Sequence, residues 1–100
     1  ALDLIRTRFG EEITARDLAK ACHMSDTNFR RVFSKALNMS PMQYLRQVRI
    51  QKACEQLILS PDSVAEIAER VGFRSISTFN RDFKQTMRVP PREWRSTHQS

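Results

Sequence analysis

The chain contains one pattern of about thirty residues twice, and this repeat restricts the possible folds more than any other feature. "DLAKACHMSDTNFRRVFSKALNMSPMQYLR", which starts at residue 17, aligns with "EIAERVGFRSISTFNRDFKQTMRVPPREWR", which starts at residue 66. The second copy has one additional residue, Arg74, in its turn. The residues shared in register are Ser25 and Ser75, Phe29 and Phe79, Arg31 and Arg81, and Phe33 and Phe83. Two copies of one small unit therefore account for most of the chain.

The size of the chain limits how much it can bury. One hundred residues with 40% hydrophobic content suit a single compact domain, or two very small ones that share a core. No apolar run approaches the roughly 18 to 20 residues that a membrane span needs. Cys22 and Cys54 lie far apart without C-x-x-C spacing, and only His23 and His98 could join them as ligands. We therefore expect two buried thiols in a reducing cytosol, with no metal site, disulfide or cofactor.

Positive charge follows the repeated pattern. The formal net charge is +6, and residues 27–54 hold six basic side chains and no acidic one. Residues 70–95 hold seven basic side chains against Asp82 and Glu93. This distribution favours a polyanionic partner, and the alternative is a basic face that only keeps the protein soluble.

The hydrophobic pattern is helical almost throughout, since no stretch shows sustained period-2 alternation. Start signals stand at Thr14 with Asp17, at Ser40-Pro41 with Gln43, and at Ser63 with Glu66. With a first helix over about 2–9, the pattern predicts an all-α fold of seven helices. Its parts are a helix-turn-helix over about 14–38, a linker helix over about 41–59, a second helix-turn-helix over about 63–88 and a closing helix over about 91–97. The linker helix would be some 27 Å long.

Each copy has an apolar stripe that would face its own small core. In the first copy the predicted stripe is Phe29, Val32, Phe33, Ala36 and Leu37, and in the second it is Phe79, Phe83 and Met87. The aromatic residue of the following Pro-led helix, Tyr44 or Trp94, would close each core. The opposite face of each helix is polar and is left for a partner.

A helix with one apolar and one polar face can enter the DNA major groove, which is about 12 Å wide. Arg30, Arg31 and Arg81 suit guanine, and Asn80 suits adenine, because their side chains can form bidentate hydrogen bonds with those bases. Hydroxyls at helix N-termini suit phosphate oxygens. The predicted phosphate contacts are Ser25, Lys35, Ser75, Thr78 and Lys84.

The second copy resembles the signature of the AraC/XylS family of bacterial transcription regulators. The shared motifs are an A-x-x-x-G-F turn (Ala68, Gly72, Phe73), a Phe-x-Arg-x-Phe helix (Phe79, Arg81, Phe83) and a closing P-x-x-W-R (Pro91, Trp94, Arg95). The resemblance implies two helix-turn-helix units joined by a long helix, with recognition helices in successive major grooves of double-stranded DNA. It places base-reading positions at Thr27, Arg30, Arg31, Ile76, Ser77, Asn80 and Arg81.

The resemblance also implies transcription regulation, by default activation through RNA polymerase, in the bacterial cytoplasm on the nucleoid. Family members commonly carry a sensing or dimerisation domain, so we expect this chain to be an excised C-terminal domain that lacks an N-terminal effector part; the alternative is a complete small regulator. Because the two copies present different residues, we expect an asymmetric DNA site. We do not expect an enzyme, since there is no Gly-rich phosphate loop or metal cluster. The alternative function is a basic helical module that binds an acidic protein.

The chain departs from the family pattern at four positions. His23 aligns with Gly72, and Asn38 and Arg88 stand where the family often has Gly. We expect His23 and Asn38 to tolerate a positive φ, whereas Arg88 is not a residue type that favours this conformation. Asp82 takes the position of Val32, and we expect it to pair with a nearby arginine because an isolated buried charge is costly.

Overall fold

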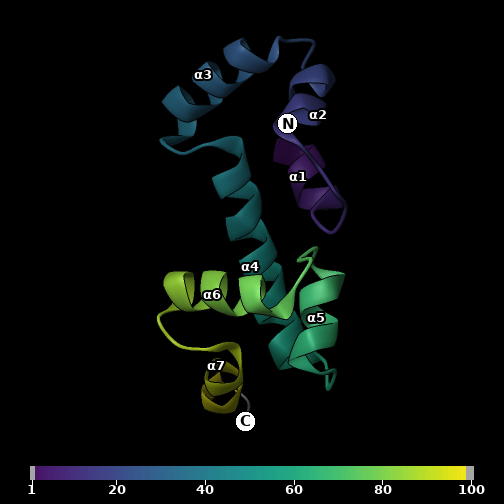
Figure 1. Cartoon of the computed structure of the whole chain (residues 1–100), viewed down its shortest axis with the longest axis vertical. Helices are drawn as coiled ribbons and strands as arrows, with labels where there is room; N and C mark the ends of the chain where they lie inside the picture. The colour runs from purple at the N-terminus through teal and green to yellow at the C-terminus, as the bar shows by residue number, and fades with distance from the viewer. Residues whose placement is uncertain (1, 99–100) are drawn as a thin grey trace. The chain divides into compact units, whose positions relative to one another are not determined.

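The computed structural model describes residues 2–98, and within this range the protein consists of seven α-helices and no strands (Figure 1). The helices are α1 (Leu2–Arg8), α2 (Ala15–Ala21), α3 (Asp26–Leu37), α4 (Pro41–Leu59), α5 (Val64–Arg70), α6 (Ile76–Met87) and α7 (Pro91–His98). The predicted all-α fold is confirmed. No helix in this range is long and apolar enough to cross a membrane.

Side-chain caps fix where the helices begin. The Thr14 hydroxyl accepts a hydrogen bond from the Asp17 amide, and the Asp17 carboxylate accepts one from the Thr14 amide at 2.9 Å. Ser40 and Gln43 form the same reciprocal pair at the start of α4. Ser63 accepts from the Glu66 amide, but its hydroxyl donates to the Glu66 carboxylate instead of completing a capping box. Each cap stabilises its helix by about 1 kcal/mol.

Residues in the left-handed backbone conformation, with a positive φ, mark where several helices end. His23 and Asn38 both have a φ of 57°, and Gly72 has a φ of 104°, as the turns of the two copies require. Arg88 takes the same conformation with a φ of 74°, and its amide donates to the Lys84 carbonyl at 2.8 Å. A non-glycine residue in this region costs about 1–2 kcal/mol, so Arg88 keeps the shape of a glycine turn at a cost in stability.

The chain divides into two compact units, residues 1–48 and 49–100, and the boundary falls within α4. Each unit has its own aromatic series. In the first, Phe33 lies between Phe29 and Tyr44, with ring centroids 5.6 and 5.9 Å away. In the second, the series is Phe73, Phe79, Phe83 and Trp94, with successive centroids 5.1, 5.6 and 6.0 Å apart. Tyr44 and Trp94 therefore close the two cores as predicted.

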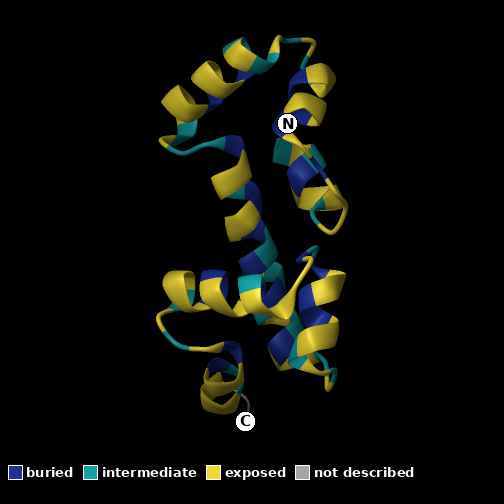
Figure 2. Ribbon diagram, in the orientation of Figure 1, coloured by how far each residue is buried: buried dark blue, intermediate teal, exposed yellow. Residues whose placement is uncertain are grey.

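The predicted stripe of α3 is wrong at two positions. Val32 is 45% exposed, and Ala36 is also exposed, whereas Phe29 and Phe33 are buried. Most of α3 is exposed, with short buried stretches along it (Figure 2). Val32 lies about 80° around the helix from the midpoint of the two phenylalanines, so it is an edge residue whose burial depends on its neighbours. At the same register of α6, Asp82 is only 4% exposed.

The two cysteines are free thiols and are half-buried, so the prediction of buried thiols is only partly correct. Burial raises the pKa of the Cys54 thiol to about 11, because the thiolate would lose hydration in this position. Residues 2–98 contain no group of three or more His, Cys, Asp or Glu side chains that could hold a metal ion.

Candidate nucleic-acid interface

The outward face of α3 presents Thr27, Arg30 and Arg31, and all three are exposed. Arg30 lies one helical turn after Asp26, and its Nε donates to Asp26 Oδ1 at 3.1 Å. Arg31 Nη2 donates to Asn28 Oδ1 at 2.7 Å. Both guanidinium groups are therefore oriented by side chains of their own helix.

These internal contacts leave most donors of the two guanidinium groups available. A guanidinium carries five N–H groups, and Arg30 uses Nε in its ion pair, so both of its Nη groups remain for an acceptor. A partly fixed side chain loses less conformational entropy when it binds a partner. The arrangement thus suits a bidentate contact with a guanine or a phosphate.

The outward face of α6 presents Ile76, Ser77, Asn80 and Arg81, which are also exposed. Arg81 Nε donates to Asp82 Oδ1 at 3.4 Å, and the two side chains are 66% and 5% exposed respectively. A buried carboxylate therefore holds an exposed guanidinium, and the expected pairing of Asp82 with an arginine is confirmed. Arg31 and Arg81 share one register, but an amide holds the first and a carboxylate holds the second.

The predicted phosphate contacts lie at the starts and along the exposed faces of the same helices. Ser25, Lys35, Ser75 and Lys84 are exposed, whereas Thr78 is half-buried. The hydroxyl oxygens of Ser25 and Ser75 accept hydrogen bonds from the amides of Asn28 and Thr78, both at 3.2 Å. The Ser75 hydroxyl also donates to Thr78 Oγ1 at 3.0 Å. Both serines thus act as helix caps, and the Ser75 proton already has an acceptor.

A groove of about 480 Å³ in the second unit brings four of the predicted site residues together. They are Ile76, Asn80, Arg81 and Lys84, and the groove is also lined by Pro90, Pro91 and Arg92 at the start of α7. Ser75, Ser77 and Thr78 do not line it.

Sequence reasoning missed Arg92, although a signal was present. Arg92 aligns with Met42 of the first copy, and it is a cation in the first turn of a helix. The helix dipole disfavours a cation there. Arg92 therefore does not stabilise its own helix through its charge, and its guanidinium is suited to contact an anion instead.

In the first unit, the surface beside α3 differs from the groove beside α6. A hollow of about 260 Å³ is lined by apolar side chains, among them Val32, Ala36 and Leu37 of α3. The base-reading candidates Thr27, Arg30 and Arg31 lie outside this hollow. The two repeated helices therefore share a register of exposed polar residues but differ in what surrounds them.

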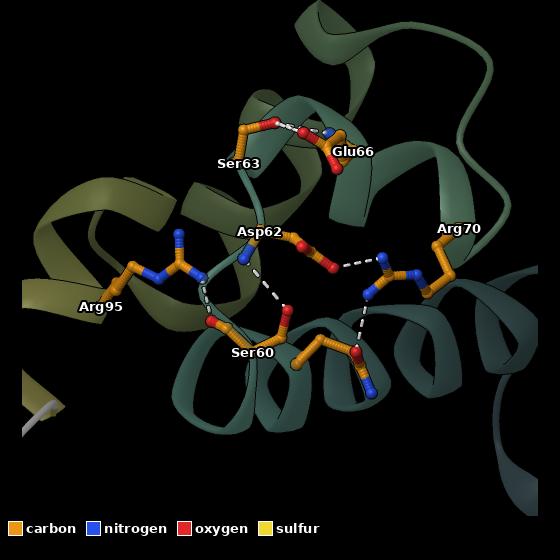
Figure 3. A network of polar contacts seen from close by, with 7 residues as sticks. Ser60, Asp62, Ser63, Glu66, Arg70 and Arg95 are labelled. Carbon is orange, nitrogen blue, oxygen red and sulfur yellow. Dashed lines mark hydrogen bonds and ion pairs between the residues drawn. The ribbon is translucent and has the colours of Figure 1, made fainter.

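Two arginines of the second copy, Arg70 and Arg95, connect α5 and α7 to the end of α4 and the loop after it (Figure 3). Arg95 donates to the Leu57 carbonyl at 2.9 Å and to the Ser60 carbonyl at 2.6 Å, and so caps the C-terminal end of α4. Arg70 donates to Gln56 at 2.8 Å and pairs with Asp62. This pairing holds the pKa of the Asp62 carboxyl below its usual value.

The known proteins that this chain resembles are transcription regulators. A sequence profile described as a helix-turn-helix domain matches residues 18–97. An uncharacterised helix-turn-helix-type transcriptional regulator of Bacillus subtilis, YdeC, is 37% identical over 90% of this chain and 31% of its own length. The lactose operon transcription activator of Staphylococcus xylosus is 28% identical over 95% of this chain and 34% of its own length.

Similarity extends to solved structures. The DNA-binding domain of AdpA, a global transcriptional factor crystallised in complex with a target DNA, superposes with a TM-score of 0.92. It is 28% identical, and the alignment covers 97% of this chain and 87% of that domain. The chain spans about a third of the length of the curated relatives that it matches.

Proposed function

The chain belongs to the AraC-type family of helix-turn-helix transcription regulators, and on that basis we propose that α3 and α6 are its two recognition helices. They would read an asymmetric site in double-stranded DNA from successive major grooves. The observation that carries this proposal is the register shared by Arg31 and Arg81. Each is exposed at the same position of its copy, and each is held by a neighbouring polar side chain.

The proposed parts of the domain follow the repeat. Residues 14–38 form the first helix-turn-helix, 41–59 the linker helix, 63–88 the second helix-turn-helix and 91–97 the closing helix. α4 is continuous through the boundary between the units, and its 19 residues span roughly 28 Å.

The base contacts that we propose are made by the exposed polar faces. Thr27, Arg30 and Arg31 would read one half of the site, and Ile76, Ser77, Asn80 and Arg81 would read the other. Lys35 and Lys84 would contact phosphates, with Arg92 as a further cation beside α6. Ser25, Ser75 and Thr78 would approach phosphates at the helix starts, where the backbone amides and the dipole favour anions.

The regulatory role is proposed from the relatives. One of them is named as an operon transcription activator, and we propose activation through RNA polymerase for this chain as well. The relatives are about three times longer, which supports a regulator with an effector or dimerisation domain on the N-terminal side. Its place of action would be the bacterial cytoplasm, on the nucleoid.

Selection of binding sites from a pool of random duplexes tests the proposed function. We expect one asymmetric sequence to be enriched, and we expect Arg31→Ala and Arg81→Ala each to weaken its binding by roughly 5- to 150-fold. Fluorescence anisotropy measures the loss, with Arg6→Ala in α1 as a matched control that removes an exposed arginine elsewhere.

The same experiment separates the proposal from a basic module that binds an acidic protein. Both kinds of binding weaken as salt rises, so salt dependence alone does not distinguish them. Loss of affinity for the selected duplex, with binding to a scrambled duplex much less affected, supports base reading. Variants that bind both duplexes as the wild type does would contradict it.

A further inference from the structure

Among the α6 residues that line the groove of the second unit, Ile76 is the apolar one. It is the first residue of α6 and is 42% exposed, whereas the other α6 residues of the lining, Asn80, Arg81 and Lys84, are polar or charged. The neighbouring segments add the cation Arg92 and four small or apolar residues, Val64, Ala65, Pro90 and Pro91. A single exposed aliphatic residue needs no explanation on a protein surface. A neighbouring set of hydrogen-bonding and cationic side chains gives this one a specific context.

The aligned position in the first unit carries a different chemistry. Asp26 stands there, and its carboxylate orients Arg30 one turn later. In the second unit the corresponding pair is Ile76 and Asn80, which also lie four residues apart and therefore on one face of the helix. An acid with an arginine in one copy is thus replaced by an apolar residue with an amide in the other.

The positive charge along the groove indicates which class of partner can bind there. Arg81, Lys84 and Arg92 give it a positive lining, which complements a nucleic acid strand. In the major groove, the thymine C5 methyl is the apolar group that distinguishes one base from the others, and adenine is the base that an asparagine recognises by a bidentate contact. Ile76 and Asn80 together therefore match the two partners of an A·T pair or of neighbouring A·T pairs.

We propose that Ile76 packs against the C5 methyl of a thymine and, with Asn80, makes the half of the site read by α6 depend on A·T pairs. This inference rests on the proposed function, because it assumes that α6 lies in the major groove. It adds the chemical identity of the bases on that side. The α3 half lacks an aliphatic residue at the aligned position, where Asp26 orients Arg30.

Uracil substitution tests the contact one methyl group at a time. Each thymine of the selected duplex is replaced in turn by deoxyuridine, which pairs as thymine does but lacks the C5 methyl. For the wild type, we expect one or two replacements in the α6 half to weaken binding by about three- to fivefold, the effect of one lost methyl contact. The α6 half is recognised as the half whose base preferences Arg81→Ala flattens.

The variant Ile76→Ala provides the matched control. It should bind the thymine duplex several-fold more weakly than the wild type, and it should show no further loss on the sensitive uracil duplex. Ile76→Val keeps a branched apolar side chain and should retain most of the discrimination. Because Ile76 is 42% exposed and lies outside the buried core, circular dichroism should show both variants folded as the wild type is.

Three outcomes divide the possibilities. A thymine-to-uracil loss that disappears in Ile76→Ala supports the inference. Uracil substitutions that all change affinity by less than twofold overturn it, while specific binding to the selected duplex leaves the proposed function intact. If no sequence is enriched from the random pool, the proposed function fails, and the inference fails with it.

Discussion

Arg31 and Arg81 occupy the same register of the two proposed recognition helices, but different neighbours hold them. Asn28 accepts from Arg31, and the buried carboxylate of Asp82 accepts from Arg81. The Arg81 contact is the longer of the two, at 3.4 Å against 2.7 Å, but it joins two opposite charges. The orientation of Arg81 should therefore depend on one neighbouring side chain.

Asp82→Asn tests this dependence without a large change in size. We expect the variant to bind the selected duplex several-fold more weakly, because Arg81 would lose its charged anchor and much of its orientation. Binding to a scrambled duplex should be unchanged or slightly tighter, since the variant carries one more unit of positive charge. Anisotropy titrations on both duplexes give the ratio of the affinity for the selected duplex to the affinity for the scrambled one.

The aligned substitution Val32→Asn is the control, because this side chain is exposed and Asn28 holds Arg31. It should leave the ratio of specific to scrambled binding at the wild-type value. A second check is the pair Arg81→Ala and Asp82→Asn combined, which should lose no more than Arg81→Ala alone. If Asp82→Asn keeps the wild-type ratio, Asp82 does not position Arg81.

At the scale of single helices, the termini were the most predictable part of the structure. Capping residues act within their own helix, so Thr14 with Asp17 and Ser40 with Gln43 could be recognised from spacing alone. Burial at the edge of a stripe depends on tertiary neighbours. The same register is exposed at Val32 and buried at Asp82, and no periodicity distinguishes the two.

Arg95→Met tests the cap at the end of α4. The substitution keeps an apolar stem but removes the donors to the Leu57 and Ser60 carbonyls. Losing hydrogen bonds from a charged group should destabilise the second unit by about 2 kcal/mol. Urea unfolding followed by the fluorescence of Trp94, the single tryptophan, reports on this unit.

Arg92→Met is the matched change for this measurement, since it replaces an exposed arginine of the same helix. It should change stability by less than about 0.5 kcal/mol and should weaken DNA binding on all sequences alike. Equal unfolding midpoints for Arg95→Met and Arg92→Met would show that Arg95 does not cap α4.

Acid should destabilise the protein through the carboxylates that its helices use. Hydrogen bonds from Thr14 lower the pKa of Asp17, and the hydrogen bond from Arg70 lowers the pKa of Asp62. Their folded-state pKa values lie below those of the unfolded chain, so the unfolded state binds protons first as pH falls. The stabilisation is complete above the unfolded value, about 4, and is lost as pH falls through the folded values.

Urea midpoints measured between pH 7 and pH 3 check this expectation, with Asp17→Asn and Asp62→Asn as test variants. Each should be less stable than the wild type at pH 7, and the difference should shrink toward pH 3. A difference that stays constant across the range would mean that the two carboxylates do not contribute through their charge.

At the scale of the whole molecule, the repeat predicted the architecture, and the structure added what lies beside each copy. Two helix-turn-helix units could be expected because the motifs recur in register through Phe29, Phe33, Phe79 and Phe83. The groove that includes Arg92 could not, because it is formed by α5, α6 and α7 together. Differences between the copies are therefore where the proposed asymmetry of the DNA site would originate.

The central claim is that the two repeated helices read different halves of one DNA site. Site selection with the wild type, Arg31→Ala and Arg81→Ala, followed by comparison of the base preference at each position, tests it most directly. We predict that each variant flattens the preference in one half only, and that the two affected positions lie about 10 base pairs apart. Variants that flatten the same positions, or none, would contradict the claim.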